Sequence, residues 1–282
     1  MRLAVIGIGL IGGSLALTLK KKGFVNNVIG VDTNPNHQAD ALRLGVVDEI
    51  MSLEDALQVA DLIAIATPVN IAEQLLPSIL NGLRVGGKQV VFDMGSTKER
   101  IVQIAAENEN KGRFIATHPM WGTEFSGPSA AQSDAFMGKA TVVCNASAAD
   151  ADALEIVTNM YQVLEMHVVQ MNATEHDIHV AYVSHISHIT SFALANTVLE
   201  KEKESDTIFA LASGGFESTV RLAKSNAAMW VPIFMQNKEN VLDVLNEHIS
   251  QLRKFKACLE KENFDYLSDL IENANQIKRI LK

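Results

Sequence analysis

The chain has 282 residues, enough for about two domains, and its 48% hydrophobic and 20% charged residues are ordinary for a globular protein. This composition excludes disordered and collagen-like chains. The formal net charge is −9, and residues 1–171 and 172–282 are each acidic, so we expect no nucleic acid among the partners.

The apolar segment at residues 3–19 has some features of a signal peptide. It contains four glycines and is followed by three lysines rather than by a cleavage site, so we expect no secretion. No other apolar run approaches the ~20 residues that a membrane-spanning helix needs, and we expect no membrane partner. The two cysteines, Cys144 and Cys258, are far apart and form no C-x-x-C pair. A reducing compartment fits this pattern, and we expect a cytoplasmic protein.

Short apolar runs alternate with helical patterns through residues 1–171. The runs typical of buried strands are 3–9, 25–32, 60–68, 87–96, 113–119, 140–145 and 165–171. Helical patterns between them cover residues up to 22, then 35–44, 53–59, 71–80, 98–107 and 148–163. This alternation predicts a parallel sheet with right-handed helical crossovers.

The pattern changes after Asn172, where no convincing strand remains. Helices are predicted at 174–203, 233–261 and 264–281, with a break at Gly214-Gly215. Two series with a spacing of seven form one apolar stripe: Val241, His248 and Phe255, and Leu245, Leu252 and Leu259. The stripe fits either a seam inside one chain or an interface between subunits.

A glycine motif follows the first strand and opens the first helix. Gly7, Gly9 and Gly12 form G-x-G-x-x-G, which permits a tight turn and close approach of a pyrophosphate to the backbone. Leu10 and Ile11 lie between these glycines, at the helix N-terminus.

An acidic residue supports the same interpretation. Asp32 ends the second strand, where a carboxylate accepts hydrogen bonds from ribose hydroxyls and repels a 2′-phosphate. The cofactor is therefore predicted to be NAD. We expect a Rossmann-type α/β nucleotide-binding domain at 1–171 and an all-α domain at 172–282.

Polar residues after the next strands define a candidate catalytic site. Thr67 and Pro68 end the third strand at the carboxyl edge, where nucleotides bind to such sheets. Ser96 follows the fourth strand, and His118 lies at the end of the fifth. A histidine there can take a proton from a substrate hydroxyl while hydride leaves the same carbon. Ser96 could bond the same hydroxyl, although a helix N-cap is its plainer role.

Five motifs, in order along nearly the whole chain, resemble those of the prephenate/arogenate dehydrogenases of tyrosine biosynthesis. They are G-x-G-x-x-G-G-S from Gly7, D-M-G-S-T-K from Asp93, H-P-M-W-G-T-E-x-S-G from His118, S-H-I-S-H from Ser184, and G-G-F-E-S-T-V-R-L-A from Gly214, with Trp230 and Asn237 beyond. The resemblance implies oxidative decarboxylation of prephenate to 4-hydroxyphenylpyruvate with NAD. It also implies a homodimer, with the helical domain binding substrate and mediating dimerisation.

The resemblance further implies roles for individual residues. His118 would bond the 4-hydroxyl of the substrate ring and drive its oxidation, supported by Ser96. Arg221 would bind a substrate carboxylate. The remaining implied pocket residues are His188, His185, Thr123 and Glu124.

Four histidines on the helix after Asn172 raise the alternative of a metal site. An ideal helix places His176 and His179 largely opposite His185 and His188, so we expect no metal. On this basis His176 and His179 are predicted to be solvated or interfacial. The other two are predicted to line the substrate pocket.

Two departures from the family pattern bear on the substrate. Glu217 and Ser218 stand where many members have a basic residue and an aspartate. An acidic Glu217 raises the hypothesis of an amino-bearing substrate, arogenate. Trp121 replaces a residue that is usually small, and it either narrows the pocket or only packs.

Other functions remain as alternatives. Arogenate dehydrogenase, which gives tyrosine directly, is the nearest. A β-hydroxyacid dehydrogenase would carry a lysine early in its helical domain, but none lies between Lys139 and Lys201. A non-catalytic NAD-binding sensor would be expected to lack His118, Ser96 or Arg221, and all three are present.

Overall fold

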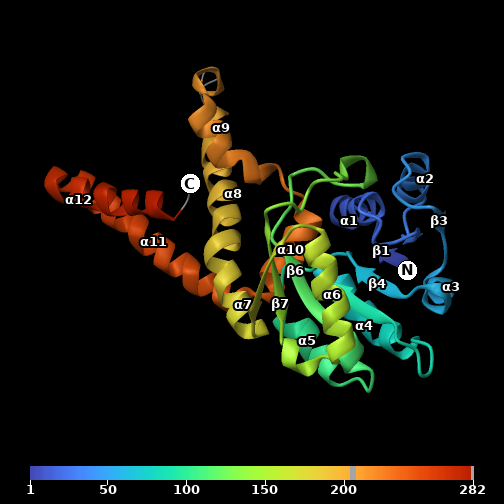
Figure 1. The fold of residues 1–282 in the computed structure, drawn as a ribbon. Helices are drawn as coiled ribbons and strands as arrows, with labels where there is room; N and C mark the ends of the chain where they lie inside the picture. The colour runs from blue at the N-terminus through green and yellow to red at the C-terminus, as the bar shows by residue number, and fades with distance from the viewer. Residues whose placement is uncertain (204–207, 281–282) are drawn as a thin grey trace. The chain divides into compact units, whose positions relative to one another are not determined.

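A computed structural model describes residues 1–203 and 208–280 (Figure 1). By contacts, the chain forms two compact units, Met1–Asn237 and Lys238–Lys282. The first unit contains an eight-stranded sheet and all the candidate site residues. Among the described residues, no helix has the length and hydrophobicity needed to cross a membrane.

The sheet has the strand order β3-β2-β1-β4-β5-β6-β7-β8. Its strands are β1 (Arg2–Ile6), β2 (Asn27–Val31), β3 (Glu49–Ile50), β4 (Leu62–Ile65), β5 (Val90–Asp93), β6 (Phe114–Pro119), β7 (Ala140–Cys144) and β8 (His167–Met171). The seven predicted strands are present, and the predicted Rossmann-like arrangement is confirmed. The sequence prediction missed β3, because two residues give no periodic signal.

The alternation of strands and helices predicted a parallel sheet, but one pair of strands is antiparallel. Strands β1 to β6 pair in parallel, but β7 runs antiparallel to β6, with His118 opposite Val142. The connection between them carries only a short 3₁₀ turn, Pro128–Ala130. A parallel neighbour needs a long crossover, usually a helix, so this chain returns beside β6 in the opposite direction.

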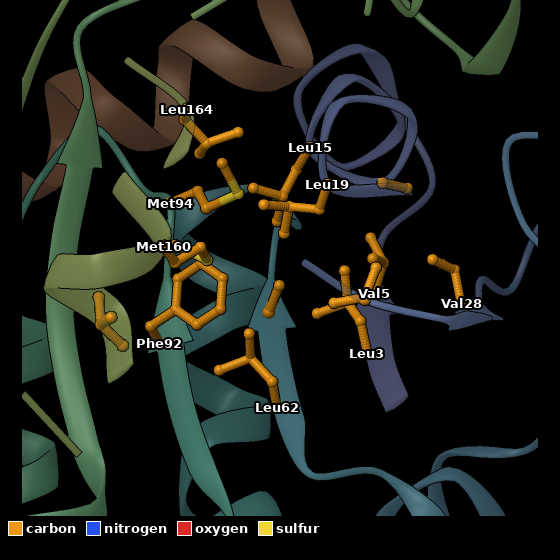
Figure 2. Close-up of a cluster of buried hydrophobic side chains, with 14 of the residues drawn as sticks. Leu3, Val5, Leu15, Leu19, Val28, Leu62, Phe92, Met94, Met160 and Leu164 are labelled. Atoms are coloured by element: carbon orange, nitrogen blue, oxygen red, sulfur yellow. The ribbon is translucent and has the colours of Figure 1, made fainter. Parts of the chain in front are cut away.

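Both faces of the central strands of the sheet are buried. In β1, Leu3 and Val5 enter one hydrophobic cluster, while Ala4 and Ile6 enter another. This follows from the two-residue period of a strand. Figure 2 shows Leu3 and Val5 in the first cluster, with leucines of α1 and Met160 of α6.

Six helices accompany this sheet. They are α1 (Leu10–Lys21), α2 (Pro35–Arg43), α3 (Leu53–Val59), α4 (Val69–Asn81), α5 (Glu99–Ala106) and α6 (Ala151–Val163). Helices α1 and α6 contribute to the first cluster, and α3, α4 and α5 to the second. Each helix lies where its pattern predicted it, within a few residues.

The first unit continues with helices beyond residue 171. They are α7 (Ala173–Val180), α8 (Ile186–Glu202), α9 (Gly214–Val220) and α10 (Ala227–Gln236). Helix α7 contacts α5, and α10 contacts α4. A π-helical turn, Ala181–His185, joins α7 to α8. The break in the chain that was predicted at Gly214-Gly215 does not lie there, because these two residues begin α9.

The second unit consists of α11 (Lys238–Glu260), α12 (Phe264–Ala274) and a 3₁₀ turn, Asn275–Arg279. The expected single helix over 233–261 is wrong, because Asn237 leaves the helical conformation and ends α10. The expected helix over 264–281 ends earlier, and its last residue lies outside the described residues. Along the predicted stripe Val241 is buried, but Leu252 and Leu259 are 56% and 61% exposed.

Candidate active site

The glycine motif follows the carboxyl end of β1 and packs closely against the backbone that follows β4. Gly7 has φ +93°, and a Cβ there would lie 2.8 Å from the Ala66 oxygen. A Cβ on Gly12 would lie 2.3 Å from the Gly7 oxygen. A Cβ on Gly9, by contrast, would meet no heavy atom within 4 Å among the described residues beyond its chain neighbours. Two glycines therefore permit close packing of the protein, while the third leaves open space above the turn.

Helix α1 begins at this turn without a side-chain cap. Its N-cap is Gly9, and its first turn, with Leu10 and Ile11, contains no acidic residue. The first N–H groups of a helix have no partner within the helix, and together with the helix dipole they favour an anion. The turn and the helix start together form a site suited to a pyrophosphate.

Asp32 is held rigidly beyond the end of β2. Its Oδ2 accepts the N–H of Ile8 at 2.9 Å, and its Oδ1 accepts that of Asn34 at 2.9 Å. His37 lies beside it, with Nδ1 3.5 Å from Oδ2. A fixed carboxylate beside the glycine turn has the placement needed to bond ribose hydroxyls.

Two buried polar atoms lie at the start of α4 without a hydrogen-bond partner among the described residues. They are Thr67 Oγ1 and Asn70 Oδ1. Pro68 stands between β4 and α4 as the N-cap residue. Buried polar atoms are seldom left unsatisfied, so these atoms fit a site that a ligand completes. The glycine turn, Asp32 and Thr67 together fit a bound dinucleotide.

The loop after β5 is fixed by a buried ion pair. Lys98 and Asp93 contact each other with side chains 0% and 1% exposed. Asp93 also accepts the N–H groups of Gly95 at 2.9 Å and Thr117 at 3.1 Å. These bonds tie the half-buried Ser96 loop to β6, the strand that carries His118.

His118 belongs to a buried chain of polar side chains. Its Nδ1 lies 2.9 Å from Nε2 of His176, whose Nδ1 lies 2.7 Å from Oδ1 of Asp177. His118 is 9% exposed, and His176 is fully buried. The expectation that His176 is solvated or interfacial is therefore wrong, whereas His179 is exposed.

A second group of rings lies at the π turn and on α8. His185 is buried, and its Nδ1 lies 3.2 Å from Nδ2 of Asn237, which also donates to the Asp177 carbonyl at 2.7 Å. In the part of the chain that the structure describes, Nε2 of His185 has no hydrogen-bond partner. His188 stacks on Trp230 with ring centroids 3.5 Å apart. The two histidines thus share Trp230, since His185 contacts the same ring edge-on, with centroids 5.9 Å apart.

Arg221 forms an ion pair with Glu124. Arg221 Nη1 lies 3.2 Å from Glu124 Oε2, and the arginine side chain is 51% exposed. Thr123, in the same loop as Glu124, accepts the N–H of Phe125 at 3.3 Å. The structure thus brings two of the predicted substrate residues into contact. Trp121 packs edge-on against Phe136, which favours the packing role for it.

Burial keeps the cluster histidines neutral near pH 7. It lowers the pKa of His118 well below the usual histidine value, and nearby His176 and Lys98 lower it further. Burial also lowers the pKa of His176, an effect that the bond to Asp177 opposes. It lowers the pKa of His185 to about 4. Burial likewise lowers the pKa of the half-buried His188.

His176 and Asp177 were not predicted as site residues, because residues 174–203 were projected onto one ideal helix. The π turn holds more residues per turn than an α-helix, so it shifts the phase of everything after it. His176 and His185 consequently contribute to one buried cluster rather than to opposite faces. The one feature of the sequence that could have indicated this pair is that Asp177 directly follows His176.

Comparison with known proteins agrees with this geometry. The family model for the prephenate dehydrogenase nucleotide-binding domain matches residues 15–170, and the model for the prephenate dehydrogenase dimerization domain matches residues 172–273. The chain belongs to the prephenate dehydrogenase family. The resemblance predicted from the motifs is confirmed.

Three relatives show how far this family likeness extends. Prephenate dehydrogenase of Bacillus subtilis is 30% identical over 96% of this chain and 74% of its own length. A crystal structure of prephenate dehydrogenase from A. aeolicus with hydroxyphenyl propionate and NAD⁺ has a TM-score of 0.90 and 29% identity, covering 99% of this chain and 97% of that one. Synechocystis arogenate dehydrogenase has a TM-score of 0.77 and 25% identity over the full length of both chains.

Proposed function

We propose that this protein is an NAD-dependent prephenate dehydrogenase that converts prephenate to 4-hydroxyphenylpyruvate and CO₂ in tyrosine biosynthesis. The observation that carries the proposal is the position of His118. It lies near the carboxyl end of β6, in a sheet whose β1 end carries a dinucleotide-binding turn, and it is neutral and nearly buried. Family membership supplies the reaction class, and the motifs favour prephenate.

The cofactor-binding residues in this proposal are Gly7, Gly9, Leu10, Ile11, Gly12, Asp32, Thr67 and Pro68. The turn and the start of α1 bind the pyrophosphate, and Asp32 bonds the adenosine ribose. NAD⁺, when bound, supplies a hydride acceptor. The carboxylate of Asp32 disfavours a 2′-phosphate, so NAD is preferred to NADP.

His118 accepts the proton of the 4-hydroxyl while the ring carbon that carries this hydroxyl is oxidised by loss of hydride. Its Nδ1 bonds His176, so Nε2 is the nitrogen that serves the substrate. Ser96 bonds the same hydroxyl or orients the ring. Oxidation gives a dienone whose loss of CO₂ makes the ring aromatic, and His118 returns its proton to the phenolate oxygen. One neutral histidine therefore covers the acid–base requirement.

Arg221 binds a substrate carboxylate. A guanidinium offers two parallel N–H groups to a carboxylate, the geometry of a strong charge-assisted bond. Glu124, the ion-pair partner of Arg221, is proposed as a substrate-binding residue beside it. His188, His185 and Thr123 line the same pocket. The proposal places no metal in this site.

The protein is proposed to act as a cytoplasmic homodimer. The match of residues 172–273 to a dimerization domain supports the dimer. So do the exposed leucines of α11, because Leu252 and Leu259 are each more than half exposed in one chain. The free thiols of Cys144 and Cys258 fit a reducing compartment.

Formation of NADH on incubation of the purified protein with NAD and prephenate tests the function. The expected result is steady turnover, and His118→Asn should lower kcat by about 10²–10⁴-fold while leaving NAD affinity unchanged. Arogenate assayed in parallel decides the nearest alternative. No NADH from either substrate would overturn the proposal, and a fully active His118→Asn variant would remove His118 from its role.

A further inference from the structure

The buried chain from His118 to Asp177 has a fixed hydrogen-bonding direction. Asp177 Oδ1 accepts the N–H of Lys98 at 2.8 Å, and its Oδ2 accepts that of Glu99 at 2.9 Å. Both carboxylate oxygens therefore act as acceptors at the start of α5. Because Oδ1 is an acceptor, the Nδ1 of His176 beside it must carry a proton.

That proton determines the state of the next ring. His176 is buried and neutral, so with a proton on Nδ1 its Nε2 has a lone pair. The 2.9 Å contact with His118 then requires a proton on Nδ1 of His118. The reverse arrangement would place two lone pairs face to face. A neutral His118 with its proton on Nδ1 has a free lone pair on Nε2.

We propose that His176 and Asp177 are positioning residues that hold His118 in the tautomer whose Nε2 accepts the substrate proton. This inference rests on the proposed function for its consequence in turnover, but the tautomer itself is a property of the resting protein. It assigns a role to two residues that the family motifs in the sequence did not point to.

The charges around His118 explain why a positioned partner is needed. The titratable groups that face it are His176 on α7, Lys98 after β5, and His185 in the π turn, and each lowers its pKa. Lys98 is neutralised by Asp93. When His118 gains the substrate proton, Asp177 is the anion connected to it through His176, and it stabilises the transient imidazolium.

Paired substitutions at His176 separate positioning from packing. His176→Leu removes the acceptor for Nδ1–H of His118, and it should lower kcat by about 10²-fold with little change in KM. His176→Gln keeps an acceptor oxygen, and it should restore most of the loss. His179→Leu and His179→Gln, on the exposed side of the same helix, are the matched controls and should retain wild-type kcat.

The kinetic outcomes are distinguishable. A His176→Leu variant with wild-type kcat would overturn the positioning role, as would equal losses in the Leu and Gln variants. Absence of turnover in the wild-type protein with prephenate and arogenate would instead contradict the proposed function, and it would leave the tautomer to be decided by the second measurement.

Long-range ¹H–¹⁵N NMR of the full chain labelled at histidine reads the tautomer directly. The wild-type protein should show His118 protonated at Nδ1 and unprotonated at Nε2, and His176→Leu should raise the Nε2–H fraction. His118→Asn assigns the signal by its loss. A wild-type His118 protonated mainly at Nε2 would overturn the proposal, whatever the kinetics.

Discussion

The nucleotide edge and the histidine cluster belong to one compact unit, yet they are built from different parts of the chain. The nucleotide edge is formed mainly by closely packed backbone. Glycine is required at positions 7 and 12 because a Cβ there would collide with the main chain. The histidine cluster uses side chains: His118 and His176 are positioned by hydrogen bonds over long sequence separations. The first construction is therefore sensitive to added atoms, and the second to lost partners and to pH.

The largest effect is expected from adding one methyl group to the nucleotide edge. In Gly12→Ala, the Cβ would lie 2.3 Å from the Gly7 oxygen and 2.7 Å from Val5 Cγ1. The free energy of unfolding should fall by about 3 kcal/mol, and NAD affinity by more than ~100-fold. Urea unfolding and calorimetric titration with NAD measure the two.

Gly9→Ala is the matched control for this effect. Its Cβ meets no protein atom within 4 Å, and its φ of −89° suits any residue. Stability should change by less than ~0.5 kcal/mol, whereas NAD affinity should fall by about tenfold because the methyl occupies the pyrophosphate approach. Wild-type NAD affinity in Gly9→Ala would contradict the assigned binding site.

The histidine cluster should instead respond to acid. The fold lowers the pKa of His118, His176 and His185, so below pH ~6.5 the unfolded chain binds protons that the folded chain does not. The contribution of these histidines to the free energy of unfolding should be fully present above pH ~6.5. It should decrease as the pH falls toward 4, by up to about 1.4 kcal/mol per pH unit for each group. Unfolding in urea at several pH values measures the slope.

A substitution within the cluster sharpens this test. His185→Phe removes one of the three groups and should reduce the pH slope of stability. His179→Phe changes an exposed histidine and should leave the slope as in the wild type. An unchanged slope in His185→Phe would show that burial of this ring does not couple folding to protonation.

A moderate effect is expected at the exposed rim of the site. Arg221→Gln removes a charge-assisted bond to a substrate carboxylate, and it should raise KM about tenfold with a smaller change in kcat. Arg221→Lys keeps the positive charge but lacks the planar guanidinium, so its KM should lie between the values of the wild type and of Arg221→Gln. A KM for prephenate that is unaffected by either substitution would exclude Arg221 from substrate binding.

The smallest effect is expected at Glu217. This residue lines a surface hollow of about 420 Å³ with Ser213 and Phe216, among others. If its carboxylate favours the amino group of arogenate, Glu217→Lys should shift the kcat/KM ratio by a few-fold toward prephenate. An equal ratio in wild type and variant would rule out Glu217 as the source of substrate preference.

The difference between the two regions also explains what the sequence could predict. Gly7, Gly12 and Asp32 were recognisable because a backbone constraint appears in the sequence as a residue type at a fixed spacing. The buried strands were recognisable from their apolar runs. The antiparallel direction of β7 was not recognisable. It follows from the absence of a crossover helix in the described loop between β6 and β7, and the apolar run of β7 carries no sign of it.

The histidine cluster was only partly predictable. His118 and His188 belonged to motifs, but the bond between His118 and His176 joins β6 to α7 and left no local pattern. The end of α10 at Asn237 was also missed, because the apolar period continues through it. Its side chain instead bonds the Asp177 carbonyl, a contact visible only in three dimensions.

The π turn between α7 and α8 has a consequence for insertions and deletions. A π turn holds about one residue more per turn than an α-helix, so removing one residue from it, such as the exposed Val183, would convert it toward an α-helical turn. The residues after it would rotate far less than the roughly 100° that a deletion within an α-helix causes, and His188 would stay near the face that stacks on Trp230. This segment can therefore lose one residue and still present His188 to the site, which an α-helical segment cannot.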